Sequence, residues 1–283
     1  MSENTAKKVN MELKHVEQYF PQGSGLFHAL EDVDLKINTG DFICLVGSSG
    51  CGKTSLLNIL AGYATPYSGS VQVNGAAFHK PSSDVGVVFQ QANLFPWLSV
   101  RENIEFGLKR KRGISKAQRR EIADYYMDVV GLTKFADSLP HELSGGMKQR
   151  ATIARTLAPD PKIILLDEPF SALDALTREK LQQHIYQIWQ KTKEEKSFLF
   201  ITHDVDEALL LSNRILVMQP NPGRIANDLP NRLDRSKSSF FRTIRETDEF
   251  WNMRNYLIEQ ITTRDGSKNT APPNNKQLAS QFS

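Results

Sequence analysis

The sequence has 283 residues, of which 40% are apolar and 24% are charged, a composition typical of globular proteins and unlike that of disordered chains. The net charge of +3 does not by itself indicate a nucleic-acid or an acidic partner. The N-terminal residues lack the apolar core of a secretory signal, and no later run approaches the ~20 apolar residues that span a bilayer.

Apolar stretches bounded by turn residues predict strands, and helical patterns lie between several of them. The clearest predicted strands are residues 41–46, 71–73, 85–89, 163–166, 198–202 and 215–218. The alternation of strands and helices predicts an α/β domain built around a largely parallel sheet.

Residues 100–139 depart from this alternation, because they are charged, favour helix and contain no convincing strand. We interpret them as a helical insertion. Its basic cluster, at residues 109–112 with Arg119 and Arg120, is either a nucleic-acid patch or, as we prefer, a solvated helix face or a loop near anionic lipid.

The C-terminal part begins with a turn-rich segment, residues 221–235, which predicts a short hairpin and a linker. Apolar residues then recur at roughly helical spacing, which predicts a helix that packs on the body of the protein or on a partner. They are Phe240, Phe241, Ile244, Trp251, Leu257, Ile258 and Ile261. From Thr262 the sequence is polar and nearly free of large apolar groups, so we expect a disordered tail.

A glycine-rich segment between a predicted strand and a predicted helix matches the phosphate-binding pattern GxxxxGK[ST] at every position. It comprises Gly47, Ser48, Ser49, Gly50, Cys51, Gly52, Lys53 and Thr54. Its backbone N–H groups and the start of the helix can bind an anion, while Lys53 reaches the terminal phosphates and the Thr54 hydroxyl ligates Mg²⁺. A bridge between Cys51 and nearby Cys44 would distort this loop, so a reduced, cytosolic compartment fits best.

Polar residues that end other predicted strands complete a site for nucleoside triphosphate hydrolysis. Asp167 and Glu168 follow an apolar strand, and we expect Asp167 to hold Mg²⁺ and Glu168 to orient and deprotonate the attacking water. Taken alone, an Asp-Glu pair is often a solvated turn. His203 and Gln90 also end strands, where a structural cap is the alternative to a contact with phosphate, water or metal.

A second motif, Leu-Ser-Gly-Gly-Met at residues 143–147, opens a predicted helix and offers another N-terminus to an anion, although a serine cap on an ordinary helix is the simpler interpretation. With the phosphate loop before it and the Asp-Glu pair after it, the series resembles the ATP-binding cassette (ABC) family. Met147 stands where that family usually has glutamine. The resemblance extends from about residue 11 to about residue 228.

This resemblance implies a P-loop NTPase fold of the α/β class: a RecA-like core, an antiparallel β subdomain and an inserted α-helical subdomain. The implied ATPase domain covers residues 11–230, with the helical subdomain at about 91–158, followed by a linker and helix at 231–261 and the tail at 262–283. It also implies that Gln90 and His203 act in catalysis, that Gln90 joins Thr54 and Asp167 at Mg²⁺, and that an aromatic residue, Phe20 or else Tyr19, stacks on adenine.

Family members work as head-to-tail pairs, so the resemblance implies that each ATP lies between the phosphate loop of one subunit and Ser144, Gly145 and Gly146 of the other. Asp174, which ends a segment similar to the family's D-loop, is also implied to bind ATP. The second ATPase subunit is either an identical chain or a paralogue. Isolated monomers should then bind ATP but hydrolyse it poorly.

A narrower likeness, carried by NLFPWLSVRENI after Gln90 and by the residues around Glu168 and His203, is to ATPase subunits of nitrate, sulfonate, taurine and bicarbonate importers. It implies a membrane permease against residues 94–105, a solute-binding protein, a peripheral position at the cytoplasmic face of the cell membrane, and no nucleic acid. Phe95, Trp97 and Leu98 suit that permease groove, although they could equally be core. The alternative function is a non-transport ABC ATPase acting on nucleic acid, but the sequence lacks the long coiled-coil insertion, zinc-binding cysteines or second cassette that such proteins usually carry.

Overall fold

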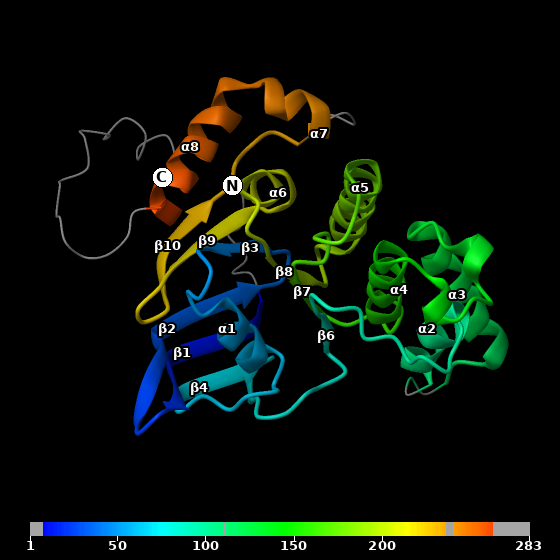
Figure 1. Ribbon diagram of the computed structural model, residues 1–283, viewed down its shortest axis with the longest axis horizontal. Coiled ribbons are helices and arrows are strands. Elements are labelled where there is room, and N and C mark those ends of the chain that lie inside the picture. Colours follow the sequence, from blue (N-terminus) through cyan, green and yellow to red (C-terminus); the bar gives the residue numbers. More distant parts are fainter. Residues whose placement is uncertain (1–7, 110, 112, 236–239, 263–283) are drawn as a thin grey trace, which may run out of the picture.

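The computed structural model describes residues 8–109, 111, 113–235 and 240–262. Within these ranges, the strands form two sheets (Figure 1). The smaller sheet is antiparallel and has the order β2-β1-β4-β5, formed by β1 (Val9–Gln22), β2 (Gly25–Asn38), β4 (Ser68–Val73) and β5 (Ala76–Ala77).

The larger sheet has the order β10-β9-β3-β8-β7-β6 and carries the phosphate loop. Its strands are β3 (Phe42–Gly47), β6 (Val85–Val88), β7 (Ile163–Asp167), β8 (Ser197–Ile201), β9 (Arg214–Gln219) and β10 (Arg224–Pro230). All neighbouring pairs are parallel except β9 and β10, which form an antiparallel hairpin. Only its second strand lies in the segment 221–235 for which a hairpin was predicted, because the first strand, β9, comes before that segment. The mainly parallel α/β sheet predicted from the sequence is confirmed.

Side chains of β3 alternate between two hydrophobic cores, one on each face of the larger sheet. Phe42, Cys44 and Val46 belong to one core, and Ile43 and Leu45 belong to the other. All six residues of β3 are buried, as expected for a strand covered on both faces. Helix α1 (Lys53–Leu60) and the antiparallel sheet cover one face. Helices α4 (Gly145–Leu157), α5 (Ala175–Thr192) and α8 (Asp248–Thr262) contribute to the core on the other.

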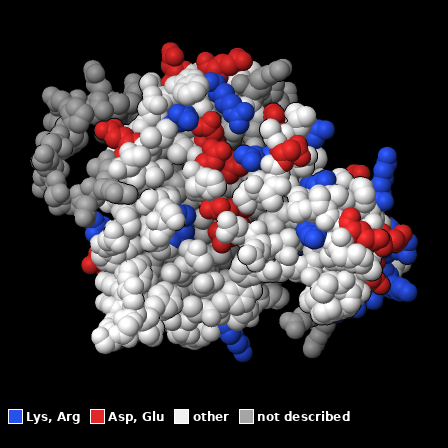
Figure 2. Space-filling view, in the orientation of Figure 1, with Lys and Arg blue, Asp and Glu red and all other residues white. Residues whose placement is uncertain are grey.

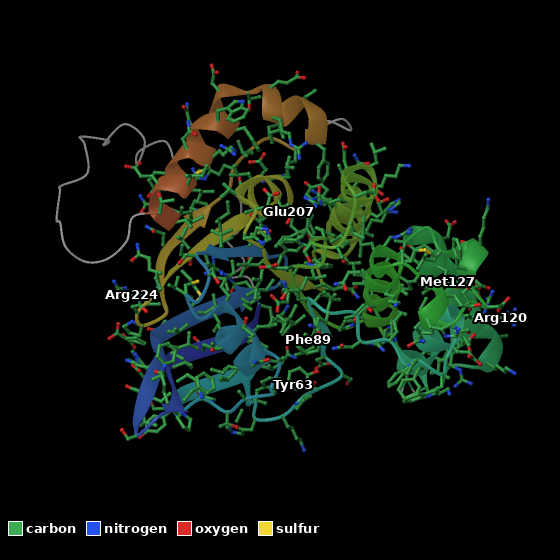
Figure 3. All side chains as sticks on the ribbon, viewed as in Figure 1. Tyr63, Phe89, Arg120, Met127, Glu207 and Arg224 are labelled. Atoms are coloured by element: carbon green, nitrogen blue, oxygen red, sulfur yellow. The ribbon has the colours of Figure 1, made fainter. Side chains whose placement is uncertain are left out.

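The predicted helical insertion is present beside the sheet (Figure 1). It contains α2 (Val100–Leu108), α3 (Lys116–Val129) and the short turns η1 (Thr133–Phe135) and η2 (Pro140–Glu142). Ser99 and Ser115 begin α2 and α3 with reciprocal capping boxes, which is why the charged sequence starts helices there. Met127 lies inside this subdomain and Arg120 at its outer edge (Figure 3).

Acidic residues lie among the basic ones over this subdomain on the face drawn in Figure 2. Arg101 pairs with Asp124, and the Nζ of Lys111 lies 3.9 Å from Asp160 Oδ2. Two members of the basic cluster, Arg110 and Arg112, lie outside the described residues. The mixture of charges agrees with a solvated helix face better than with a uniform nucleic-acid patch.

The C-terminal helix departs from the single helix predicted. The chain forms α7 (Phe240–Thr243), a short turn η3 (Ile244–Glu246) and then α8, and the hydroxyl of Thr247 accepts a hydrogen bond from Phe250 N at 3.3 Å. This new start turns Phe250, Met253 and Leu257 inward and leaves Trp251 49% exposed. Thr262 still belongs to α8, and the rest of the predicted tail lies outside the described residues.

Helix α6 (Val205–Leu211) follows β8 and lies against α8 (Figure 1). Within the described ranges, no helix combines the length and apolarity needed to cross a bilayer.

Candidate functional site

The phosphate loop connects the end of β3 to the start of α1. Gly50 and Gly52 adopt positive φ angles of 78° and 96°, and Gly52 caps α1 without a side-chain hydrogen bond to the helix N–H groups. The Nζ of Lys53 donates to the carbonyls of Gly47 at 2.9 Å and Ser48 at 2.8 Å. The loop therefore leaves the helix N-terminus free of a side-chain cap and curls its lysine over its own backbone.

Close packing beneath the loop explains why two of its glycines are required. A Cβ on Gly47 would lie 2.6 Å from the carbonyl oxygen of Met218. One on Gly52 would lie 3.0 Å from the carbonyl oxygen of Ala29, at a φ of 96° that side chains rarely adopt. Cys51 is fully buried and is a free thiol, as is Cys44. Cys51 therefore supports the loop from below.

Glu168 lies between the two other polar residues that end strands. Its Oε2 accepts a hydrogen bond from Gln90 Nε2 at 3.1 Å, and its Oε1 lies 3.2 Å from His203 Nδ1. Its backbone has a φ of 43°, a conformation that costs a non-glycine residue free energy, and its N–H donates to Ile201 O at 2.9 Å. The strained turn thus aims the carboxylate across the ends of β6 and β8.

These residues line a cavity of about 510 Å³ at the carboxyl ends of β3, β6, β7 and β8, the usual place for a ligand in a parallel α/β sheet. The lining residues are Phe27, Ala29, Gly47, Ser49, Gly50, Gly52, Lys53, Thr54, Ser55, Gln90, Asp167, Glu168 and His203. Tertiary structure therefore brings most of the predicted site together. Of the predicted loop residues, Ser48 and Cys51 are not among those that line the cavity.

The donor set of this cavity fits a phosphate chain with a divalent cation. Burial raises the pKa of Asp167, the adjacent charge of Glu168 raises it further, and Lys53 opposes both effects. A cation held by the oxygens of Thr54, Gln90 and Asp167 would relieve this repulsion between carboxylates, and hard oxygen donors are those that Mg²⁺ prefers.

The second motif lies outside the cavity. Ser144 caps α4, its Oγ accepting a hydrogen bond from Met147 N at 3.3 Å, and Asp174 caps α5 in the same way through Thr177 N at 3.0 Å. A Cβ on Gly146 would lie 3.0 Å from Leu173 Cδ2, so this glycine lets α4 approach the segment before α5. A Cβ on Gly145 would meet nothing within 4 Å, so nothing in the described part of this chain requires glycine there.

The aromatic residues of the β1–β2 hairpin separate onto two sides. Tyr19 pairs with His28 and stacks on its ring at 4.3 Å, whereas Phe20 pairs with Phe27. Phe20 is 40% exposed, and its cross-strand partner Phe27 lines the cavity although Phe20 itself does not. Sequence reasoning missed Phe27, which the hairpin turn around residues 23–25 could have placed opposite Phe20.

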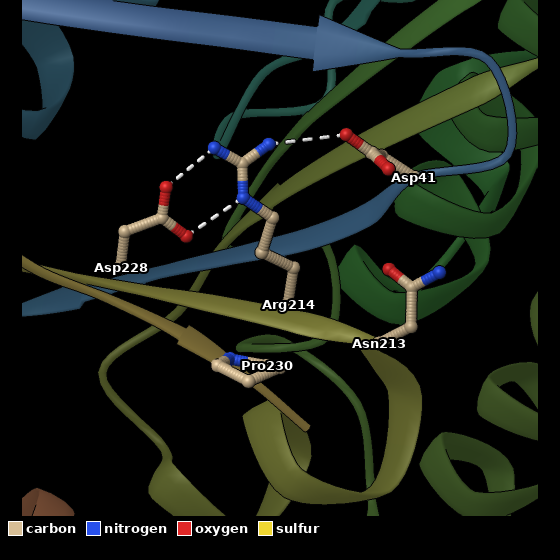
Figure 4. Close-up of a pocket in the computed structure, with 5 residues that line it drawn as sticks. All are labelled: Asp41, Asn213, Arg214, Asp228 and Pro230. Atoms are coloured by element: carbon tan, nitrogen blue, oxygen red, sulfur yellow. Dashed lines mark hydrogen bonds and ion pairs between the residues drawn. The ribbon is translucent and has the colours of Figure 1, made fainter. Parts of the chain in front are cut away.

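A second cavity, of about 260 Å³, lies at the other end of β3 (Figure 4). Arg214 donates to both carboxylate oxygens of Asp228, at 2.7 and 2.5 Å, and to Asp41 Oδ2 at 3.1 Å. Because its guanidinium is already paired with two carboxylates, this residue ties β9 and β10 to the start of β3 and is no anion site.

Comparison with known proteins agrees with this geometry. The ABC transporter family profile matches residues 30–171. The chain is 44% identical over 246 residues to the nitrate import ATP-binding protein NrtD of Synechocystis sp., covering 86% of this chain and 91% of that protein. It is 46% identical over 235 residues to the taurine import ATP-binding protein TauB of Roseobacter denitrificans, covering 82% of this chain and 86% of that protein.

Among solved structures, a dimeric ATP-binding cassette in a post-hydrolysis state with ADP and inorganic phosphate superimposes with a TM-score of 0.72. It is 33% identical in sequence and covers 78% of this chain and 99% of that chain. The chain therefore belongs to the ABC transporter family of ATPases. Within it, this protein is an ATP-hydrolysing subunit of the importer type.

Proposed function

We propose that two ATPase subunits pair head to tail, so that each ATP is held by the cavity of one subunit and by Ser144, Gly145 and Gly146 of the other. The observation that carries this proposal is Gly145, an exposed glycine at a helix N-terminus whose missing side chain has no explanation within the described chain. A phosphate brought by the partner subunit explains it, because the N–H groups of α4 could then be approached closely.

In this proposal, Lys53 moves from the loop carbonyls to the terminal phosphates, and Thr54, Gln90 and Asp167 hold Mg²⁺. The metal supplies neutralisation of phosphate charge. Glu168, aimed by its strained turn, orients and deprotonates the attacking water, while His203 donates a hydrogen bond toward the terminal phosphate. Phe20 stacks on adenine, with Phe27 beside it at the mouth of the cavity.

We further propose that the output of this cycle is movement of a transmembrane permease, with the subunit peripheral to the cytoplasmic face of the membrane. An aromatic surface formed by Phe95, Trp97 and Phe106 supports this docking. Trp97 is 71% exposed and Phe106 42%, so neither is core. Relatives that import nitrate and taurine support a small oxyanion or sulfonate as solute, delivered by a solute-binding protein.

The composite site can be tested by complementation between two inactive variants of the full chain. Lys53→Ala inactivates one half of each site, and Gly145→Asp places a negative charge at the other half, where an acidic residue in the first turn of α4 is compatible with helix formation. Each variant alone should lack turnover, whereas a mixture should regain it, because one site of each mixed dimer is intact. A mixture that stays inactive argues for sites within single subunits.

A second measurement concerns the catalytic step. Glu168→Gln should bind ATP with Mg²⁺ and accumulate as a dimer with little turnover, while wild-type turnover per subunit should fall on dilution. If wild-type turnover per subunit stays constant at all dilutions, the head-to-tail dimer is contradicted. If Glu168→Gln hydrolyses ATP normally, Glu168 is not the catalytic base. Copurification of nucleic acid without a membrane protein would favour the alternative function.

A further inference from the structure

The position of His203 depends on the turn that contains it. Its side chain is 69% exposed, so little packing holds the ring. The backbone around it is held instead: Thr202 Oγ1 donates to Glu207 Oε2 at 2.7 Å and accepts from Asp204 N at 3.0 Å. Glu207 lies in the first turn of α6 (Figure 3). The placement of His203 therefore follows the placement of that helix.

Residues that follow β10 hold the carboxyl end of α6. Arg235 Nη2 donates to Leu209 O at 2.7 Å, and its Nε donates to Leu210 O at 3.1 Å. Asn231 Nδ2 donates to the carbonyls of Leu209 at 2.9 Å and Ser212 at 3.0 Å. These donors satisfy carbonyls that a helix end leaves without intrahelical partners.

Helix α8 holds the other end of α6. Phe250 and Leu257 are fully buried on its inner face. From the same helix, Arg254 Nε donates to Asp206 Oδ1 at 2.7 Å, and its guanidinium lies 5.3 Å from the centroid of the Trp251 ring. Asp206 is in the first turn of α6, directly before Glu207. The C-terminal segment thus contacts both ends of α6, the helix that positions His203.

We infer that Arg254 is a positioning residue for ATP hydrolysis: its ion pair with Asp206 fixes the first turn of α6 and, through Glu207 and Thr202, the histidine that faces Glu168. This inference rests on the proposed role of His203. It gives the C-terminal helix, which lies outside the matched residues 30–171, a part in the reaction. The contact acts on turnover and leaves ATP binding unchanged, because neither Arg254 nor Asp206 lines the cavity.

The test uses five variants of the full chain, assayed at protein concentrations where wild-type turnover per subunit does not change on dilution. Arg254→Asp should lower kcat about fivefold. This factor corresponds to the upper end of the free energy that a partly exposed ion pair contributes. KM for ATP should stay within about twofold of wild type. Arg254→Lys should retain most of the activity, and the double variant Asp206→Arg with Arg254→Asp should regain it. Arg245→Asp, the same change at an exposed arginine of the same segment, should have no effect.

Unchanged kcat in Arg254→Asp overturns the inference, as does a loss that the double variant does not restore. The inference is also overturned if kcat falls together with a lower thermal unfolding midpoint and a raised KM. A contact with a merely structural role would change all three. His203→Ala separates the two proposals. If that variant retains turnover, the role of His203 fails. If it loses turnover while Arg254→Asp keeps it, only the positioning role fails.

Discussion

In the proposed ATP site, Lys53 exchanges its hydrogen-bond partners when ATP binds. Its ammonium group donates hydrogen bonds to the carbonyls of Gly47 and Ser48. Phosphate oxygens are stronger partners because they carry charge. In this proposal, ATP binding replaces the neutral carbonyl acceptors of the loop with charged phosphate oxygens.

Lys53→Ala should weaken ATP binding by about 10-fold or more, the range expected for lost hydrogen bonds to a charged group. Equilibrium titration with a fluorescent ATP analogue measures the affinity. Lys162→Ala is the matched control, since Lys162 is exposed at the opposite end of β7. Equal affinities for wild type and Lys53→Ala would refute the phosphate contact.

Glu207 is a buried carboxylic acid beside the turn that contains His203. Burial raises its pKa above the ordinary 4.5, and the hydrogen bond from Thr202 opposes the shift. The folded state therefore holds the proton more tightly than the unfolded state does. It follows that the free energy of unfolding decreases as the pH rises from about 4.5 through the raised pKa, because charging Glu207 costs more in the folded protein.

Glu207→Gln removes this charge but keeps polar atoms for Thr202 and Gln182. We expect the thermal unfolding midpoint of the variant to rise relative to wild type as the pH increases above about 4.5. Unfolding curves over a pH series measure the difference. Glu246→Gln, at an exposed site, should show no such trend. If the midpoints of Glu207→Gln and wild type differ by the same amount at every pH, charging Glu207 does not destabilise the folded protein.

At the scale of elements, one asparagine organises the segment between β6 and α2. Asn103 on α2 is fully buried, and its Oδ1 accepts from Phe95 N at 2.8 Å. Its Nδ2 donates to the carbonyls of Phe95 at 3.2 Å, Leu98 at 2.9 Å and Ser99 at 3.0 Å. The side chain therefore replaces backbone partners that an irregular turn cannot supply.

Asn103→Ala should destabilise the protein by about 1–3 kcal/mol, because it leaves buried backbone groups without partners. Urea unfolding followed by far-ultraviolet circular dichroism measures the loss of stability. Asn93→Ala, at an exposed position of the same loop, is the control. Equal urea midpoints for Asn103→Ala and wild type would show that the Asn103 side chain does not stabilise the turn.

Contacts between elements also link the two halves of the proposed composite site. Gln149 on α4 is buried, and its Nε2 donates to Phe89 O at 3.0 Å. Phe89 is the residue directly before Gln90. Gly146 lets the start of α4 pack on Leu173, in the segment that follows Glu168. Helix α4, which we propose binds the partner's nucleotide, is thus in contact with the loops beside Gln90 and Glu168, the proposed catalytic residues of the same subunit.

At the scale of the whole molecule, the exposed aromatic surface of Phe95, Trp97 and Phe106 lies on α2 and the segment before it, and none of its residues lines the cavity. A charge placed there should break the proposed permease contact without touching the ATPase site. Trp97→Asp should abolish assembly with a coexpressed permease and leave the ATPase activity of the free subunit unchanged. Affinity copurification measures the assembly.

Tyr125→Asp gives a matched comparison, because Tyr125 is an aromatic residue of the same subdomain that is 54% exposed. It should assemble normally. Normal assembly of Trp97→Asp would exclude this residue from the permease contact, and loss in both variants would indicate a general defect of the helical subdomain.

Local patterns in the sequence were sufficient for the parallel sheet, the phosphate loop, the helical insertion and the polar residues that end strands. Gly47 to Thr54 carry their chemistry in consecutive residues, and capping signals such as Ser99 and Ser115 act within one helical turn. Strand termini were also informative, since parallel strands place their carboxyl ends along one edge.

Tertiary structure alone decided the contacts between residues distant in sequence. It placed Glu168 between Gln90 and His203, brought Phe27 into the cavity, and turned Phe250 rather than Trp251 into the core. It also joined Arg254 to Asp206, 48 residues away. Such contacts follow from how sheets, turns and helices pack, and a periodic pattern of apolar residues does not specify which faces meet.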